Sequence, residues 1–397
     1  MNRRLFLKSS ALAMFGVGAS PLWLSKAAAA ATNNNGARKK VLIAIFQRGA
    51  VDGLNMVVPH GEARYYELRP TIAIKNPLDL DGMFGLHPSL EPLMTPWKDG
   101  KLAIVNAAGS PDPTRSHFDA QDYMESGTPG VKSTPDGWLN RALPGGKPPS
   151  PVRAVSLGPS LPRTMRGARE AVAISNLKDF RIANAKDSES FESMYASTMD
   201  KMLAGTSKDT FDAVRAVQNV ERSVYTPANN ARYPDTRFGN SMKQIARLIK
   251  ADAGLEVAFA DMGGWDTHVN EVPQLSNLLR DFGGTLGAFY TDMGDRMADI
   301  TIVTMSEFGR TARENGTRGT DHGHANAMLV IGGNVKGGKV YGDWPGLGKD
   351  QLYEGRDLAI TTDFRDVLSE AVAKQLGVRN SVFPGYQQPK YRNLLIG

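Results

Sequence analysis

Two histidines lie two residues apart in the stretch GTDHGHANAM, residues 319–328, in a chain that holds only six histidines. His322 and His324 flank Gly323, and the carboxylate of Asp321 comes directly before them. Neutral imidazoles and carboxylates are ligands for zinc, and mixed His and carboxylate sites also take manganese, magnesium or calcium. In an extended chain, residues two apart point the same way, so both rings can face one ion. We therefore expect a divalent metal site here, with zinc as the first candidate.

Other side chains that could do chemistry follow the short apolar runs of the chain. After the run 41–46 comes Asp52, and after 101–109 come Thr114, Arg115, Ser116 and His117. After 255–260 come Asp266 and His268, and after 299–305 come Glu307 and Arg310. In open parallel sheets, ligands bind beyond the carboxyl ends of the strands. We therefore expect these side chains to gather at one end of a sheet with the 319–328 loop. The predicted metal ligands are Asp52, Asp266, His268, Glu307, Asp321, His322 and His324.

The elements that position these residues are visible in the hydrophobic pattern. Short, continuous apolar runs rich in β-branched residues are typical of strands buried on both faces, and they occur at 41–46, 101–109, 255–260, 299–305 and 327–333. AVSLG and AVAIS, in the 150–175 region, are shorter candidates. Helical spacing of apolar residues covers about 186–223, 238–252 and 275–297. Ser116 can cap a helix that ends near Glu125, and Asp363 can cap a last helix over 364–376.

This alternation of strands and helices predicts an α/β fold with a central, mostly parallel sheet and helices on both faces. We expect one such domain over residues 41–397. The segment from about 134 to 235 is less regular and could be an inserted cap.

The first 30 residues have the order of an export signal. A basic opening with Arg3 and Arg4 precedes an apolar stretch and a small-residue run that ends at Ala30. The sequence RRLFLK resembles the bacterial twin-arginine signal, which the export machinery reads as an address. Residues 31–40 are a polar spacer, and we expect a mature, periplasmic or secreted protein that begins near Ala31. The apolar stretch is too short and interrupted for a good membrane span; an ordinary secretory signal or a crude N-terminal anchor is the alternative.

Charge and cysteine content exclude several classes of function. Four basic residues of the first 30 account for most of the net charge of +6, and the remainder carries only +2. We therefore expect no nucleic-acid partner. The chain has no cysteine, which excludes disulfides, thiolate nucleophiles and cysteine-ligated metals.

The chain resembles a family of twin-arginine-exported bacterial proteins of unknown function that is often labelled sulfatase-like. Six segments carry this resemblance: RGAVDGLN, RSHFDAQDYMESG, GGWDTH, MSEFGRT, GTDHGHANAMLVIGG and TTDFRDVL. Their order also resembles the alkaline-phosphatase superfamily, which implies an alkaline-phosphatase-like three-layer sandwich. The resemblance implies that Asp52 is the ligand after the first strand and that Asp266 and His268 are an Asp/His ligand pair. It further implies His322 or His324 as the late histidine ligand, and it places Glu307 where the superfamily usually has Asp-His.

The superfamily resemblance implies metal-dependent hydrolysis of a small anionic ester, either phosphate or sulfate. Ser116 is the first candidate nucleophile and Thr114 the second, with a metal-activated water as the alternative. Arg115 and Arg310 would hold the anionic substrate.

Two departures from the superfamily pattern favour other interpretations. Glu307 is followed by Phe308 instead of histidine, and in SPDPTR the residue Ser110 stands one position too early for the sulfatase pattern, which argues against formylglycine. The alternative is a catalytically inactive, metal-stabilised binding or assembly protein on the same fold. A carbohydrate-binding scaffold is a third interpretation, and it depends only on the tryptophans Trp138, Trp265 and Trp344.

Overall fold

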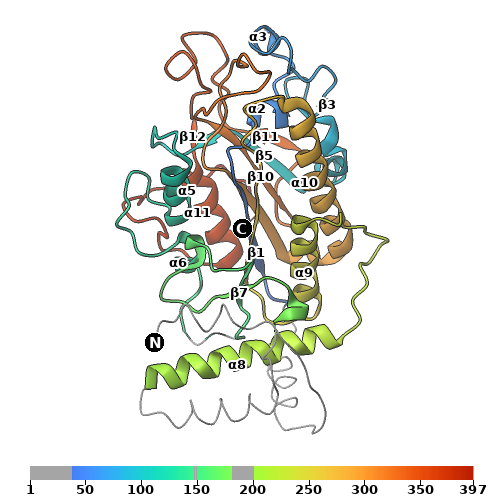
Figure 1. Ribbon diagram of the computed structural model, residues 1–397, viewed down its shortest axis with the longest axis vertical. Helices are drawn as coiled ribbons and strands as arrows, with labels where there is room; N and C mark the ends of the chain where they lie inside the picture. The colour runs from blue at the N-terminus through green and yellow to red at the C-terminus, as the bar shows by residue number, and fades with distance from the viewer. Residues whose placement is uncertain (1–37, 147, 149, 181–200, 397) are drawn as a thin grey trace.

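A nine-stranded sheet runs through the centre of the protein (Figure 1). The computed structural model describes residues 38–396 except 147, 149 and 181–200. The strand order is β11-β5-β10-β9-β1-β8-β6-β7, with β12 beside β5. The strands are β1 (Val41–Gln47), β5 (Leu102–Gly109), β6 (Ala154–Leu157), β7 (Val172–Ile174), β8 (Val257–Met262), β9 (Ile300–Met305), β10 (Asn326–Gly332), β11 (Lys339–Tyr341) and β12 (Thr362–Asp363).

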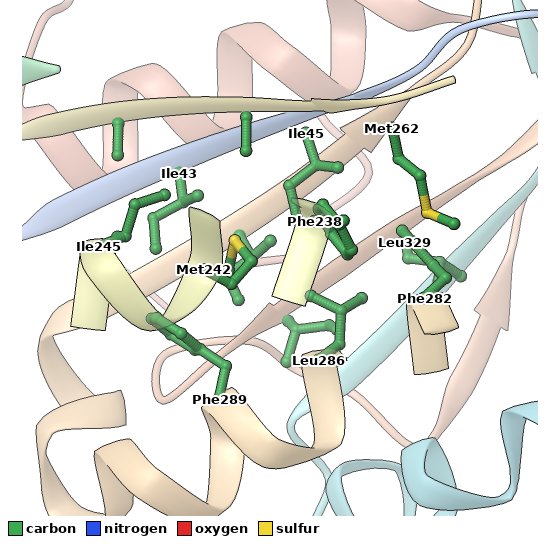
Figure 2. Close-up of a cluster of buried hydrophobic side chains, with 14 of the residues drawn as sticks. Ile43, Ile45, Phe238, Met242, Ile245, Met262, Phe282, Leu286, Phe289 and Leu329 are labelled. Atoms are coloured by element: carbon green, nitrogen blue, oxygen red, sulfur yellow. The ribbon is translucent and has the colours of Figure 1, made fainter. Parts of the chain in front are cut away.

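The central strand β1 separates two hydrophobic layers because successive side chains of a strand point to opposite faces. Ile43 and Ile45 pack into one cluster, whereas Leu42 and Phe46 pack into the other. The first cluster is covered by α9 (Arg237–Lys250) and α10 (Glu271–Met293), and Figure 2 shows their side chains packed against β1. The second cluster is covered by α5 (His117–Ser126), α6 (Trp138–Arg141) and α11 (Phe364–Leu376). The fold is therefore a three-layer α/β sandwich, as predicted.

Strand β10 is antiparallel to both of its neighbours, β5 and β9, whereas the other pairings of the main sheet are parallel. The start of β10 consequently lies at the end of the sheet where β1, β5, β8 and β9 finish. Because β10 runs in this direction, the loop before it meets the loops that follow β1, β5, β8 and β9. The hydrophobic pattern could not reveal the direction, because a strand buried on both faces looks the same either way.

The remaining elements surround this sheet. A small antiparallel sheet has the order β2-β4-β3, with β2 at Val57–Val58, β3 at Leu78–Asp79 and β4 at Gly85–Leu86. The other helices are α2 (Gly53–Met56), α3 (Ala63–Leu68), α4 (Met94–Lys98) and α8 (Lys201–Arg222), and the 3-10 helices are η1 (Pro88–Leu93), η2 (Arg163–Met165), η3 (Leu177–Asp179) and η4 (Gly294–Asp299).

The predicted strands and helices match the structure closely. AVSLG and AVAIS, the shorter candidates inside the segment 134–235, form β6 and β7, which pair with the main sheet and extend it at one edge. Ser116 is the N-cap residue of α5, but its side chain makes no capping hydrogen bond, whereas Asp363 does cap α11. The first part of the helix predicted at 186–223 lies outside the described residues, and α8 forms the rest.

The predicted export signal, residues 1–30, and most of the predicted spacer also lie outside the described residues. Among the helices of the described part, none combines the length and the apolar character needed to cross a membrane.

Candidate metal centre

Three imidazoles and one carboxylate meet where β5 and β8 end and β10 begins. His117 is the first residue of α5, Asp266 and His268 lie in the loop after β8, and His322 lies in the loop before β10. One ligand atom each from His117, Asp266 and His322 lies within 4.8 Å of the other two. The Nε2 atom of His268 is 2.9 Å from Asp266 Oδ1 and 3.0 Å from His322 Nε2. We call these four residues the imidazole cluster.

The opposite nitrogen of each ring is held by an acceptor. The Nδ1 atoms of His117 and His268 lie 2.9 Å from Glu307 Oε1 and 3.0 Å from Asp321 Oδ1, respectively. His322 Nδ1 lies 2.8 Å from the carbonyl oxygen of Arg115. Since a carbonyl oxygen can only accept, Nδ1 of His322 carries the proton. Hydrogen bonds of this kind orient metal-binding imidazoles and direct their Nε2 atoms toward the ion.

The inner atoms of the cluster bring several electron pairs together beside one guanidinium, that of Arg310. In neutral rings with protonated Nδ1 atoms, the Nε2 atoms of His268 and His322 face each other and Asp266 Oδ1 with lone pairs, while Arg310 donates to Asp266 Oδ1 at 2.6 Å and lies 3.4 Å from His268 Nε2. Nε2 of His117 is buried without a hydrogen-bond partner in the described part of the chain, and it lies 3.4 Å from Asp266 Oδ2. Such an arrangement is stabilised either by extra protons or by a bound cation.

The spacing of these atoms fits zinc. Ligand atoms about 2 Å from a tetrahedral zinc ion lie about 3.3 Å from one another. The contacts among Asp266, His268 and His322, 2.9 to 3.1 Å, are close to that spacing, and the ligand atoms of His117, Asp266 and His322 lie within 4.8 Å of one another. Two histidines and an aspartate provide three ligands, and His268 could be a fourth. The residues present therefore fit a divalent metal ion bound by nitrogen and oxygen atoms.

Arg310 joins the loops that carry the cluster. Its side chain is fully buried and donates to Asp266 Oδ1 at 2.6 Å and to the carbonyl oxygens of Gly49, Ala50 and Trp265. Burial alone would raise the pKa of Asp266, but the nearby guanidinium of Arg310 lowers it. Arg310 thus keeps Asp266 ionised, and its own charge is already committed to the protein.

Protonation differs between the rings. The hydrogen bond to Glu307 raises the pKa of His117, whereas burial lowers the pKa of His322. Glu307 is itself buried; burial would raise its pKa, but the hydrogen bond with His117 and others lower it. Without a metal ion, these shifts make His117 hold an extra proton more readily than His322 does.

Two glycines permit the close approach of the loops. A Cβ atom on Gly323 would lie 2.3 Å from the carbonyl carbon and oxygen of Arg310, whose backbone pairs with that of His322. Gly49 has a φ of +115°, and a Cβ atom there would lie 2.9 Å from the backbone nitrogen of Asp266. Gly323 thus lies against the Arg310 backbone.

Among the predicted metal ligands, Asp266, His268 and His322 lie in the imidazole cluster, and Asp321 is the orienting partner of His268. Glu307 orients His117: its Oε1 atom also accepts from the Gly49 backbone N–H and from Gln121, which leaves no free position for an ion on that oxygen. The structure thus places the predicted ligands Asp321 and Glu307 behind the imidazole rings, outside the imidazole cluster.

Asp52 and His324 lie apart from the cluster. The Asp52 carboxylate is buried in a two-point ion pair with Arg69 and accepts from the N–H of Leu54 at the start of α2. The ring of His324 stacks on Tyr353 with centroids 4.3 Å apart, and burial lowers its pKa to about 4. His322 and His324 therefore face different surroundings, because the chain pairs with Arg310 at His322 and does not continue as a regular strand until Asn326.

The predicted catalytic residues differ in whether their side chains are already bound to other parts of the protein. Ser116 is directly before His117, and its hydroxyl makes no hydrogen bond to the described part of the chain. The Thr114 hydroxyl accepts the N–H of Ser116. Arg115 is bound to Glu354 and Asp357, so its guanidinium is committed to other parts of the protein, like that of Arg310.

His117 is the residue whose role the sequence analysis missed. It was placed in the expected group of side chains but not among the predicted ligands. A usable signal was its position as the first residue of a helix that follows a buried strand.

The fold and this site define a three-layer α/β protein with a candidate metal centre at the carboxyl end of its sheet. The chain belongs to the family described as "Protein of unknown function (DUF1501)", which matches residues 39–382. This match confirms the family resemblance found in the sequence. A search of curated proteins gives no match.

Several solved structures are similar to the chain at low identity. The PsFucS1 sulfatase from Pseudoalteromonas sp. is 12% identical with a TM-score of 0.37, over 94% of this chain and 78% of that one. The zinc complex of the C-terminal periplasmic domain of EcEptC from Escherichia coli is 10% identical with a TM-score of 0.34, over 75% and 74%. A protein in the alkaline phosphatase superfamily from Vibrio parahaemolyticus is 11% identical with a TM-score of 0.32, over 75% and 60%.

Proposed function

We propose that the protein is an exported, metal-dependent hydrolase of small phosphate or sulfate esters that acts in the periplasm or outside the cell. The observation that carries the proposal is the convergence of the Nε2 atoms on Asp266, with each Nδ1 held from behind. His117, Asp266 and His322 would hold the ion, with His268 beside them, and zinc is the first candidate. Export by the twin-arginine route is part of the same proposal.

A metal ion at this position would polarise an ester oxygen and lower the pKa of a hydroxyl or water. The chain's own residues would supply order and charge balance. Glu307 and Asp321 hold the rings of His117 and His268, and Arg310 keeps Asp266 ionised. The Ser116 hydroxyl stands at the N-terminus of α5, where the helix dipole favours an anion or an ionised nucleophile.

The second candidate is a metal-stabilised binding or assembly protein that has no hydrolytic activity. The contacts of Arg115 and Arg310 favour this candidate. Both guanidinium groups already bind carboxylates or carbonyl oxygens of the protein, so neither is free to bind an anionic ester as the superfamily resemblance implies.

The test combines elemental analysis of the mature protein with a screen of aryl phosphates and aryl sulfates. His322→Ala should lose the metal and any turnover. His60→Ala is the matched control, because His60 also pairs with a carboxylate, Asp79, but belongs to no cluster. Stoichiometric metal without turnover of either ester class would support the binding protein. Wild-type protein without metal, unaffected by chelator, would remove both candidates.

A further inference from the structure

A pocket of about 380 Å³ lies against the loop that carries the imidazole cluster. This volume falls within the range typical of small-ligand sites. Four basic residues and two acidic residues contribute to its wall, so its charged lining has an excess of positive charge: Arg64, Arg313, Lys349 and Arg356 against Glu314 and Asp321.

Two of these basic side chains have no partner among the residues that the structure describes. Arg313 and Lys349 are exposed and make neither a hydrogen bond nor an ion pair through their side chains with the described part of the chain. The carboxylate of Glu314 does not neutralise them by contact, since it accepts from Thr71 and from the backbone N–H of Ile72. Two cations beside one pocket repel each other unless an anion lies between or near them.

The pocket touches the imidazole cluster from outside. Asp321, in the pocket wall, accepts from Nδ1 of His268, and Asn315, also in the wall, donates to Asp321 and to the carbonyl of His268. Arg356 donates to the carbonyl of His322. The part of the pocket wall formed by Asp321 is therefore separated from the inner atoms of the cluster by the ring of His268.

We propose that this pocket binds an oxyanion group, such as a phosphate, sulfate or carboxylate, through Arg313 and Lys349. The group belongs to the substrate, which would carry a second anionic group besides the ester at the cluster. The assignment to the substrate rests on the proposed function, whereas the binding of an oxyanion does not.

Inorganic phosphate is the probe for the pocket itself. It is titrated by calorimetry into chelator-treated His322→Ala protein, so that the imidazole cluster cannot bind it through a metal. The ionic strength is low and constant, because salt screens exposed charges. In this background, Arg313→Gln with Lys349→Gln should weaken phosphate binding at least tenfold. The charge-matched control is Lys98→Gln with Lys178→Gln, two exposed lysines outside the pocket, and it should leave binding unchanged.

The proposal would be overturned if the pocket variant and the control bound phosphate equally well. It would also be overturned if the His322→Ala protein with an intact pocket showed no measurable phosphate binding. Neither result depends on ester turnover, so a failure of the proposed hydrolase leaves this test intact.

A second arm identifies the source of the oxyanion in the metal-loaded protein. Aryl esters with and without an additional carboxylate or phosphate are compared as substrates. If the group belongs to the substrate, the pocket variant should raise KM for the doubly anionic esters alone. If free phosphate instead alters turnover of singly anionic esters, and the pocket variant removes that effect, the substrate assignment is overturned and a free anion is the ligand.

Discussion

The Nδ1 atom of His117 and the Oε1 atom of Glu307 lie 2.9 Å apart, and the same oxygen also accepts from the backbone of Gly49 and the side chain of Gln121. The carboxylate therefore has a fixed place and fixes the ring. This relationship joins the ends of β1, β5 and β9 at a single oxygen atom.

Replacing the orienting carboxylate should weaken metal binding without abolishing it. For Glu307→Gln we predict about a 10- to 100-fold loss of zinc affinity, because the amide is a poorer acceptor for the His117 N–H. Competition with a chromogenic chelator measures this directly. The comparison variant is Asp321→Asn, whose carboxylate is 54% exposed and should matter less. Equal zinc affinity in wild type and Glu307→Gln would contradict an orienting role.

The two loop histidines should respond differently to truncation. His322→Ala should lose the metal, and chelator should no longer lower its Tm, since binding to the folded state adds stability. His324→Ala should retain the metal but lose about 2–4 kcal/mol of unfolding free energy, because a buried ring that stacks on Tyr353 is removed. Loss of metal from His324→Ala alone would instead support the original ligand prediction.

Acid should destabilise the protein partly through His87. Burial lowers the pKa of this ring to about 4, below its ordinary value of 6.5. The unfolded chain therefore binds a proton that the folded protein excludes, and stability that is complete above pH 6.5 is lost as the pH falls toward 4. We predict that this group alone costs about 2 kcal/mol of unfolding free energy between pH 7 and pH 5.

The variant His87→Asn isolates that contribution. Nδ1 of His87 caps η1 by accepting from the N–H of Ser89, and asparagine can supply the same acceptor without titrating. Urea unfolding of both proteins at pH 7 and pH 5 gives the measurement. Parallel losses of stability in the two proteins would show that His87 does not titrate in this way.

The buried ion pair of Asp52 and Arg69 should be structural. Asp52→Asn leaves a buried guanidinium without its charged partner, and we predict a loss of about 3–5 kcal/mol in unfolding free energy. Metal content should remain unchanged if Asp52 is no ligand. Glu67→Gln, which breaks the exposed pair with Arg64, is the control and should cost less than about 1 kcal/mol.

Export should depend on the paired arginines at the start of the chain. We predict that replacing both Arg3 and Arg4 by lysine blocks appearance of the protein in the periplasm, because the twin-arginine machinery reads that pair. Cell fractionation, with N-terminal sequencing of the exported protein, checks both the route and the expected start near Ala31. An undiminished periplasmic fraction would point to another route.

The regular elements could be predicted from the sequence, because their signals are local. The run VLIAIF is buried on both faces as β1, and the apolar spacing of 238–252 became α9. The small sheet and the direction of β10 could not be predicted, because two-residue strands have no periodicity and strand direction leaves no trace in a continuous apolar run.

The site was predictable in composition but not in detail. Asp266, His268 and His322 were found because polar side chains follow or precede buried strands. The ion pair of Asp52 and Arg69 depends on the irregular segment that brings the guanidinium into the core, and no sequence pattern predicts that pair. His324 was assigned by alternation in an extended chain, whereas the local backbone follows its pairing with Arg310 instead.

The place of β1 in the sheet has a consequence for synthesis on the ribosome. This strand is the first of the main sheet to emerge, yet both of its neighbours, β8 and β9, lie in the second half of the chain. At about 5–20 residues per second, the seven apolar or amide residues of VLIAIFQ wait on the order of 10–40 s before a partner strand exists. During that interval, the nascent chain carries an unpaired strand that would aggregate or engage a chaperone. The imidazole cluster, whose ligands come from both halves, cannot capture an ion until translation is nearly finished.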